Sequence, residues 1–173
     1  MKEIEIKILE ISPVKIRNML KKNKAKFVKR VLQKNNIYSN FSAKRKKTLV
    51  RLRQEGSNCW LTVKGPKKII NNHKVRKEYE MKIKSFEFGE KMLNLLGFKK
   101  ISHDERKREY YKLKSCSVEI IKLPKIPIFL EIEGNEKNIL KVANLLGYSE
   151  KDYFNGHPQD KYKIKDKFLE FEK

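Results

Sequence analysis

Polar and apolar residues alternate along the first eleven residues of the chain, MKEIEIKILEI. A period of two is typical of a β-strand, because successive side chains of a strand point to opposite faces. Glu3, Glu5 and Lys7 then share one face, and isoleucines occupy the other. The pattern predicts a strand that is apolar on one side and carries two carboxylates and an ammonium on the other.

The same pattern returns twice. The stretch VRKEYEMKI places Glu78 and Glu80 on one face, and the stretch IFLEIEG does the same with Glu131 and Glu133. A helical pattern follows each of the three acidic strands, and two of these helices end in the similar words NLLGF and NLLGY. We interpret this as a weak internal repeat of a strand followed by a helix. Three strands with paired carboxylates argue against coincidence.

Strands and helices are also predicted between and beyond these stretches. Ser12 before Pro13 is typical of a helix start, and the helix that Ser85 begins should turn Met92, Leu93 and Leu96 inward. Helices are predicted over 12–23, 85–96 and 135–146, and strands over 25–33, 37–41, 48–54, 59–64, 98–113 and 118–123. Residues 42–47 are expected to form a loop and residues 67–74 a mobile basic loop. The end of the tail, residues 161–171, fits either a strand or a helix.

Charged side chains recur on the polar faces of about eight predicted strands. They are six acids, Glu3, Glu5, Glu78, Glu80, Glu131 and Glu133, and seven bases, Lys7, Arg51, Arg53, Lys64, Arg76, Arg106 and Arg108. Alternation of this kind suits an antiparallel barrel with a polar interior and with helices covering its apolar outer face. Buried like charges are costly, so such an interior favours a highly charged anion together with a divalent cation.

The net charge of +22 indicates a polyanionic partner, either a phosphorylated small molecule, nucleic acid or an acidic membrane. The two cysteines, Cys59 and Cys116, lack metal-ligand spacing and fit a reducing compartment. No apolar run approaches the roughly 20 residues that span a bilayer. We therefore expect a single cytoplasmic domain over residues 1–173 that does not associate with a membrane.

An ordered set of motifs resembles the CYTH or triphosphate tunnel metalloenzyme family. It runs from EIEIK through LVRLR, LTVKGP, VRKEYE, RKREYY and FLEIEG to the NLLGY helix. Within that family, the stretch LPKIPIFLEIEG looks most like class IV adenylyl cyclases; other members are thiamine and inorganic triphosphatases. The resemblance implies an α+β fold, with an eight-stranded antiparallel tunnel that holds a triphosphate and Mg²⁺ or Mn²⁺.

The resemblance also implies roles for individual residues. The implied metal ligands are Glu3, Glu5, Glu131 and Glu133, and the implied triphosphate-binding residues are Lys7, Arg51, Arg53, Lys64, Arg76, Arg106 and Arg108. Lys7, Arg53 and Glu131 are the implied catalytic residues, and Glu78, Glu80 and Glu119 are candidate additional acids. Taken singly, each pair of charges also fits a solvated strand face. The ordered set favours the tunnel.

Two residues depart from the family pattern, because Asn36 and Ile121 stand where aspartate is usual. The change at Asn36 is modest. Ile121 removes an expected acid, for which Glu119 is a candidate replacement, and the loss should slow the chemical step while leaving binding intact. The three histidines, His73 and His103 among them, show no ligand spacing and are expected at the surface.

Three functions remain open. The first is an adenylyl cyclase that converts ATP to cyclic AMP and pyrophosphate. The second is a triphosphatase that hydrolyses an inorganic, nucleoside or thiamine triphosphate, and the third is a non-catalytic binder of nucleotides or RNA 5′-triphosphates. The expected partner is thus a nucleoside triphosphate or inorganic polyphosphate, with nucleic acid secondary and a homodimer as a further candidate.

Overall fold

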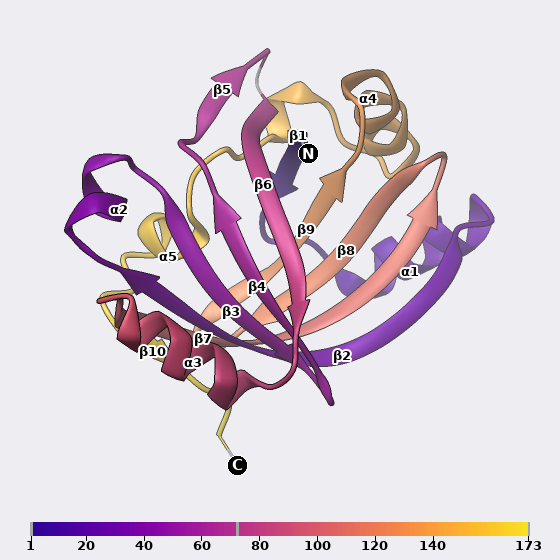
Figure 1. Cartoon of the computed structure of the whole chain (residues 1–173). Helices are drawn as coiled ribbons and strands as arrows, with labels where there is room; N and C mark the ends of the chain where they lie inside the picture. Colours follow the sequence, from indigo (N-terminus) through magenta and orange to yellow (C-terminus); the bar gives the residue numbers. More distant parts are fainter. Residues whose placement is uncertain (1, 72, 173) are drawn as a thin grey trace.

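The computed structural model describes residues 2–71 and 73–172, and a closed antiparallel barrel forms its centre (Figure 1). Eight strands follow one another around the barrel in the order β1, β9, β8, β7, β2, β3, β4 and β6, and β6 pairs with β1 to close it. They are β1 (Lys2–Ile8), β2 (Lys26–Ser39), β3 (Leu49–Glu55), β4 (Asn58–Lys64), β6 (His73–Ile83), β7 (Lys99–Leu113), β8 (Cys116–Leu123) and β9 (Ile126–Glu133). The predicted eight-stranded barrel is confirmed.

Helices lie outside the barrel (Figure 1). They are α1 (Pro13–Lys22), α2 (Phe41–Arg45), α3 (Phe86–Leu95), α4 (Glu136–Leu145) and α5 (Pro158–Lys161), with a 3-10 turn at Glu150–Asp152. Side chains of Ser12, Ser85 and Asn135 accept hydrogen bonds from backbone N–H groups three residues further on, which begins α1, α3 and α4. Within the described ranges, no helix is long and apolar enough to cross a membrane.

The hydrophobic core lies on the outer surface of the barrel. Apolar side chains on the outer faces of β1, β8 and β9 pack against α1 and α4; fully buried members are Ile6, Ile8, Val118, Leu130, Ile132, Ile16, Leu20, Ile139 and Val142. Each buried Ile or Leu contributes about 1.5–3 kcal/mol to folding. The strands are therefore held by packing from outside, and their inner faces remain polar.

A second apolar cluster joins α3 to the opposite side of the barrel. Leu93 on α3 packs against Leu52 on β3 and its neighbours. Gly89 allows this approach, because a Cβ there would lie 2.7 Å from a methyl carbon of Leu52. The prediction for Leu93 is confirmed, but Met92 and Leu96 are 44% and 65% exposed. The helix presents only a narrow stripe to the barrel.

Two local predictions for residues 25–47 were wrong. The strands expected at 25–33 and 37–41, with residues 34–36 either between or within them, form one continuous strand, β2, which ends at Ser39 and not at Phe41, because β7 pairs with it from residue 26 to residue 39 through two register shifts. The loop expected at 42–47 contains the short helix α2. The Asn40 side chain begins that helix by accepting a hydrogen bond from the Ala43 N–H at 2.8 Å.

The two segments that the sequence left as a loop or undecided also contain regular structure. The predicted basic loop at 67–74 holds β5 (Lys68–Ile70), which pairs with the start of β6. The tail holds a 3-10 turn, α5 and then β10 (Phe168–Leu169), which runs parallel to β7. Asn72, which the predicted basic loop included, lies outside the described residues, as do Met1 and Lys173.

Candidate active site in the barrel

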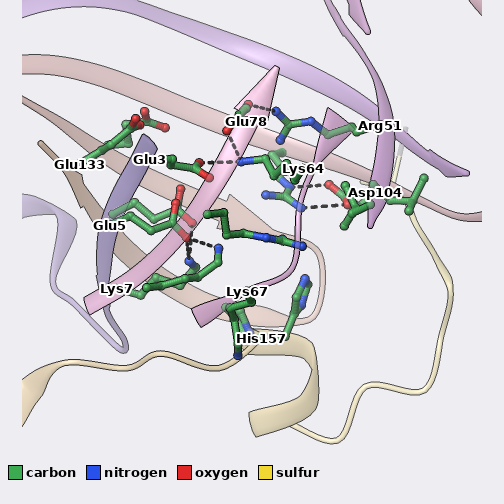
Figure 2. Close-up of a pocket in the computed structure, with 18 of the residues that line it drawn as sticks. Glu3, Glu5, Lys7, Arg51, Lys64, Lys67, Glu78, Asp104, Glu133 and His157 are labelled. Atoms are coloured by element: carbon green, nitrogen blue, oxygen red, sulfur yellow. Dashed lines mark hydrogen bonds and ion pairs between the residues drawn. The ribbon is translucent and has the colours of Figure 1, made fainter. Parts of the chain in front are cut away.

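The barrel encloses a cavity of about 950 Å³ whose lining is mainly charged (Figure 2). All fourteen candidate residues from the sequence line it: Glu3, Glu5, Lys7, Arg51, Arg53, Lys64, Arg76, Glu78, Glu80, Arg106, Arg108, Glu119, Glu131 and Glu133. With Lys67, Lys74, Asp104 and Asp160, the lining carries nine lysines and arginines and nine carboxylates. The two signs balance, so a ligand of large net charge would have to bring counter-charge with it.

Carboxylates crowd together on β1 and β9. Glu5 pairs directly across the strands with Glu133, and Glu3 is two residues from Glu5. Like charges in this position repel. Partial burial and the carboxylates of Glu3, Glu119 and Glu5 raise the pKa of Glu133 to about 7. Protonation or a nearby cation would relieve the repulsion.

Lysines from three strands partly neutralise these acids. Lys64 on β4 lies 2.5 Å from Glu3 and 2.7 Å from Glu78, and Lys7 and Lys74 both bond Glu5. One oxygen of Glu3, Oε2, is buried and accepts no hydrogen bond from any described residue. Burial raises the pKa of Glu3 despite its bond to Lys64. The neutralisation is incomplete at this position.

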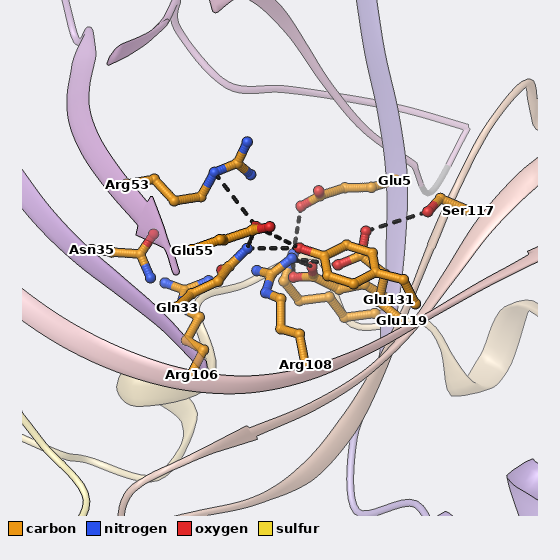
Figure 3. Close-up of polar contacts among 12 residues, drawn as sticks. Glu5, Gln33, Asn35, Arg53, Glu55, Arg106, Arg108, Ser117, Glu119 and Glu131 are labelled. Carbon is orange, nitrogen blue, oxygen red and sulfur yellow. Dashed lines mark hydrogen bonds and ion pairs between the residues drawn. The ribbon is translucent and has the colours of Figure 1, made fainter. Parts of the chain in front are cut away.

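Further along the same wall, ion pairs link four strands in a chain (Figure 3). Lys7 Nζ on β1 lies 3.2 Å from Glu131 on β9, and Arg108 on β7 lies 3.5 Å from the other Glu131 oxygen and bonds Glu119 on β8. Burial opposes ionisation of Glu131, but Lys7 and Arg108 outweigh it and lower its pKa. Lys7 and Glu131, two of the predicted catalytic residues, therefore lie side by side as a charged pair.

The arginines of β3 are held more loosely. The Arg51 guanidinium lies 3.4 Å from Thr62 Oγ1 and 3.7 and 3.6 Å from Glu78 and Glu80, all long contacts. Arg53 makes one shorter bond, at 2.8 Å to Glu80. These two side chains have donor capacity that the surrounding carboxylates do not use.

The arginines that have unused hydrogen-bond donors also lie close to one another, so positive charge is concentrated there. The Nε atoms of Arg51, Arg53 and Arg108 are buried and, within the described part of the chain, have no hydrogen-bond partner. Burial and neighbouring arginines lower the pKa of Arg51 to about 10; these neighbours are Arg53, Arg106 and Arg108. A guanidinium remains protonated at neutral pH, so the shift marks a position where an anion would be stabilised.

Sequence reasoning missed several residues that line the cavity, among them Asp104, Lys74, Lys67 and His157. Asp104 binds the Arg106 guanidinium through both of its oxygens, and Lys74 bonds Glu5. Both stand two residues from a predicted arginine on the same strand, so the alternation could have found them. Lys67 and His157 also line the cavity. They lie in irregular segments, where no period shows which way a side chain points.

The two departures from the family pattern lie in different surroundings. Asn36 is outside the cavity, where its amide donates to Glu90 at 2.9 Å. Ile121 pairs across strands with Arg108 and is fully buried in an apolar cluster with Phe129 and Leu169. Packing against the C-terminal tail thus replaces the acid that is usual at this position. Glu119, the candidate replacement acid, lies in the cavity and bonds Arg108.

The expectation of surface histidines was wrong in two cases. His73 is 5% exposed, and its Nδ1 lies beside the Asn71 carbonyl oxygen. His103 Nδ1 lies 2.6 Å from Asn36 Oδ1. His157 is open to the cavity that it lines (Figure 2).

The residues on β1 and β9 fit a divalent cation. Carboxylate oxygens are the donors that Mg²⁺ and Mn²⁺ prefer, and the unpartnered Glu3 Oε2 and the raised pKa of Glu133 show unmet demand for positive charge. Among residues 2–71 and 73–172, no three metal-ligating side chains already stand at binding distance, because lysines hold Glu3 and Glu5. Binding of a divalent cation would require these lysines to leave the carboxylates, for example by pairing with a bound anion instead.

An antiparallel barrel with a charged interior and a core outside defines the class of fold to which this chain belongs. The model of the CYTH domain family matches residues 1–154. The chain belongs to the CYTH domain family. The family resemblance of the sequence is thereby confirmed.

Relatives and solved structures agree with this membership. A protein of Methanocaldococcus jannaschii named "putative adenylate cyclase" is 32% identical over 139 residues, 79% of each chain. A conserved hypothetical protein of Pyrococcus furiosus superposes with a TM-score of 0.77 at 26% identity, covering 91% of this chain and 98% of that one. A Hippeastrum protein, described as an adenylyl cyclase candidate with a dominant triphosphatase activity, has a TM-score of 0.69 at 16% identity, covering 95% and 96%.

Proposed function

We propose that this protein is an enzyme that acts on a triphosphate bound with a divalent cation inside the barrel. One observation carries the proposal: the lining of the cavity contains both buried donors and a buried acceptor that have no hydrogen-bond partner among the described residues. The donors are Nε atoms of Arg51, Arg53 and Arg108, and the acceptor is Glu3 Oε2. A metal-bound triphosphate supplies phosphate oxygens to the first set and a cation to the second.

The balance of charge in the lining supports the same ligand. A bare triphosphate would leave the nine carboxylates of the cavity facing an anion, and a bare metal ion would face nine lysines and arginines. The two together bring less net charge into the cavity than the triphosphate alone and give both signs of the lining a partner, which limits the cost of burying charge. Glu3, Glu5, Glu131 and Glu133 would hold the metal, which when bound would withdraw electron density from a phosphate oxygen.

The basic residues would then order the phosphate chain. Arg51 and Arg53 are the most available, and Lys7, Arg106 and Arg108 would move from carboxylates to phosphate oxygens as the ligand enters. Fixed cations stabilise charge that develops on a leaving phosphate without reorganising during the reaction. In this proposal Lys7 and Arg53 stabilise that charge, and Glu131 is one of the carboxylates that hold the metal.

The first candidate reaction is that of an adenylyl cyclase. The ribose 3′-oxygen would attack the α-phosphorus of ATP, a new phosphorus–oxygen bond would form, and pyrophosphate would leave with the electrons of the broken bond. The cavity volume favours a nucleotide, because about 950 Å³ is near the upper end for small-molecule sites and exceeds the need of three phosphates. The name of the M. jannaschii relative agrees with this candidate.

The second candidate reaction is triphosphate hydrolysis. Water would attack the γ-phosphorus, and orthophosphate and the diphosphate would result. The predominance of charge in the lining favours it, because apolar and aromatic side chains that could hold a base are few: Ile37, Leu49, Tyr79, Tyr110, Leu123 and Phe129. An inorganic triphosphate needs only the charged residues.

Product identification separates the candidates. The protein is incubated with ATP, GTP, thiamine triphosphate and tripolyphosphate in Mg²⁺ or Mn²⁺, and products are resolved by chromatography and ³¹P NMR. Cyclic nucleotide with pyrophosphate supports the cyclase, and orthophosphate supports the triphosphatase. Tight binding without any product would leave a triphosphate binder and overturn the enzymatic proposal.

A further inference from the structure

The last part of the chain lies beyond the family match yet borders the cavity. The family model ends at residue 154, whereas five consecutive residues just after it, 156–160, line the cavity. This C-terminal segment, residues 155–171, therefore supplies part of the cavity wall from outside the residues that the family model matches. His157 on this wall lines the cavity, and Figure 2 shows its side chain beside Lys67.

The start of the C-terminal segment is tied to the site itself. The backbone N–H of Phe154 donates to the carbonyl oxygen of Lys7 at 2.8 Å, next to the lysine side chain in the ion-pair chain. Lys67, another cavity residue, donates to the Asn155 carbonyl at 3.1 Å. Gly156 is required by packing, because a Cβ there would lie 2.4 Å from the Phe154 ring. These contacts fix the backbone that leads into His157.

The far end of the C-terminal segment is anchored in the barrel. Leu169 is 1% exposed and packs with Ile121, Leu123, Ile126 and Phe129 in one apolar cluster. Residues 168–169 pair with β7, and the His103 N–H donates to the Lys167 carbonyl at 2.8 Å. The isoleucine at position 121 is therefore explained by the segment, because an aspartate there would face buried methyl groups.

The surroundings of His157 are those of a phosphate-binding position. His157 is exposed to the interior of the cavity, where reduced solvation and the nearby charges of Arg106, Lys7 and Lys74 lower its pKa and so favour the neutral imidazole. A neutral imidazole still has one N–H donor. It can bind a phosphate oxygen without adding repulsion among the cations already there.

We infer that the C-terminal segment is a wall of the substrate tunnel and that His157 on it donates a hydrogen bond to a phosphate oxygen of the bound triphosphate. The inference rests on the proposed function for the identity of the ligand. It adds a phosphate-contacting residue from outside the matched family domain.

The test is calorimetric titration of the full-length protein with tripolyphosphate and Mg²⁺. His157→Ala should weaken binding about 10- to 100-fold, as expected for a lost hydrogen bond to a charged group, and His157→Gln should recover part of it through its amide N–H. Lys161→Ala is the matched control, because Lys161 lies in the same segment, at the end of α5, is exposed and does not line the cavity. It should bind as the parent protein does.

Hydrogen exchange on the unmodified protein provides a second measurement. Backbone amides of residues 155–160 should exchange at least several-fold more slowly when tripolyphosphate and Mg²⁺ are present. Leu169→Ala should release the segment, increase its exchange and weaken binding. If His157→Ala binds as tightly as the parent protein and residues 155–160 show no protection, the inference is wrong.

The outcomes separate this inference from the proposed function. Binding that depends on His157 without any turnover would retain the inference and reject the enzyme. Turnover that is insensitive to His157→Ala would retain the enzyme and reject the inference. Absence of any triphosphate binding by the parent protein would overturn both.

Discussion

Two walls of the same barrel surround their carboxylates in opposite ways. On β2, β3 and β7, Glu55 accepts hydrogen bonds from Lys29, from Gln33 and, at 3.2 Å, from the Tyr110 hydroxyl (Figure 3). Burial opposes ionisation, but the bonds from Lys29 and Gln33 outweigh it and lower the pKa of Glu55. On β1 and β9, Glu133 faces other carboxylates and its pKa is raised to about 7.

The difference indicates that the protein itself supplies the partners of Glu55, whereas a ligand would supply those of the acids on β1 and β9. The Glu55 carboxylate itself is saturated with donors, although Gln33 Oε1 beside it lacks a partner among the described residues. On β1 and β9, a carboxylate oxygen, Oε2 of Glu3, is buried and has no hydrogen-bond partner within the same described ranges. A folded protein rarely leaves such groups unpaired unless something else binds there. We therefore expect the acids on β1 and β9 to affect metal-dependent turnover, and Glu55 to affect the stability of the fold.

The largest expected effect comes from removing the cation. Excess EDTA should reduce turnover by on the order of 100-fold or more, because several kcal/mol of transition-state stabilisation would be lost. Turnover should return when Mg²⁺ or Mn²⁺ is restored. Glu3→Gln should raise the Mg²⁺ concentration for half-maximal activity, and Glu55→Gln should leave it unchanged. Full activity in excess chelator would contradict the assignment of the acidic wall.

The next effect concerns the loosely held arginine. Arg51→Ala should weaken tripolyphosphate binding by about 1.5–3 kcal/mol, roughly 10- to 100-fold, and monophosphate binding much less. The melting temperature without ligand should stay equal or rise, since repulsion with neighbouring arginines is relieved. Arg45→Ala, an exposed arginine on α2, removes the same charge and should change neither quantity. Unfolding of the Arg51 variant would identify it as a structural residue.

A smaller effect is expected at the saturated wall. Glu55→Gln should lower the free energy of unfolding by about 1–3 kcal/mol at pH 7, because Lys29 and Tyr110 lose a charged acceptor. The folded-state pKa of Glu55 lies below 4.5, so this stabilisation is complete above about pH 4.5 and is lost as the pH falls further. Urea titrations should show a shallower acid-side decline in the variant. If the free energy of unfolding of the variant fell equally steeply at acid pH, Glu55 would not be the cause of the decline.

The smallest effect is expected at Glu133, where the sign reverses. A folded-state pKa of about 7, above 4.5, means that Glu133 destabilises the unliganded protein increasingly from pH 4.5 to pH 7. Glu133→Gln should therefore raise the stability at pH 8, by no more than about 1 kcal/mol because solvent screens this residue at the edge of the barrel. The two proteins should be alike at pH 4.5. A loss of stability at pH 8 would show that Glu133 is already neutralised.

The alternation of polar and apolar residues was enough to predict which side chains of a strand point into the barrel. In a strand, the side of a residue depends only on its parity, so Glu3, Glu5 and Lys7 could be assigned to one face without any knowledge of neighbours. The same argument put Arg106 and Arg108 in the interior. It also extends to Asp104, two residues before Arg106, although that residue was overlooked.

Charge pattern and family resemblance together were enough for the barrel, its polar interior and the external helices. Alternation cannot show the lengths and breaks of strands, which depend on partners far away in sequence. Strand β2 appeared as two strands because only its pairing with β7 carries it through residues 34–36. Helix α2 was missed because five residues give too short a pattern, and its start depends on the Asn40 cap.

The sequence by itself determined which side chains face inward on each strand, because that property is local and repeats every two residues. Only the tertiary structure decided which of those charges are neutralised and which remain available, since each partner comes from a different strand of the closed barrel. It also decided that His157 borders the cavity and that Ile121 is buried under Leu169. Both features depend on how the C-terminal segment packs against the barrel. Its backbone is irregular, so no sequence period predicts where its side chains point.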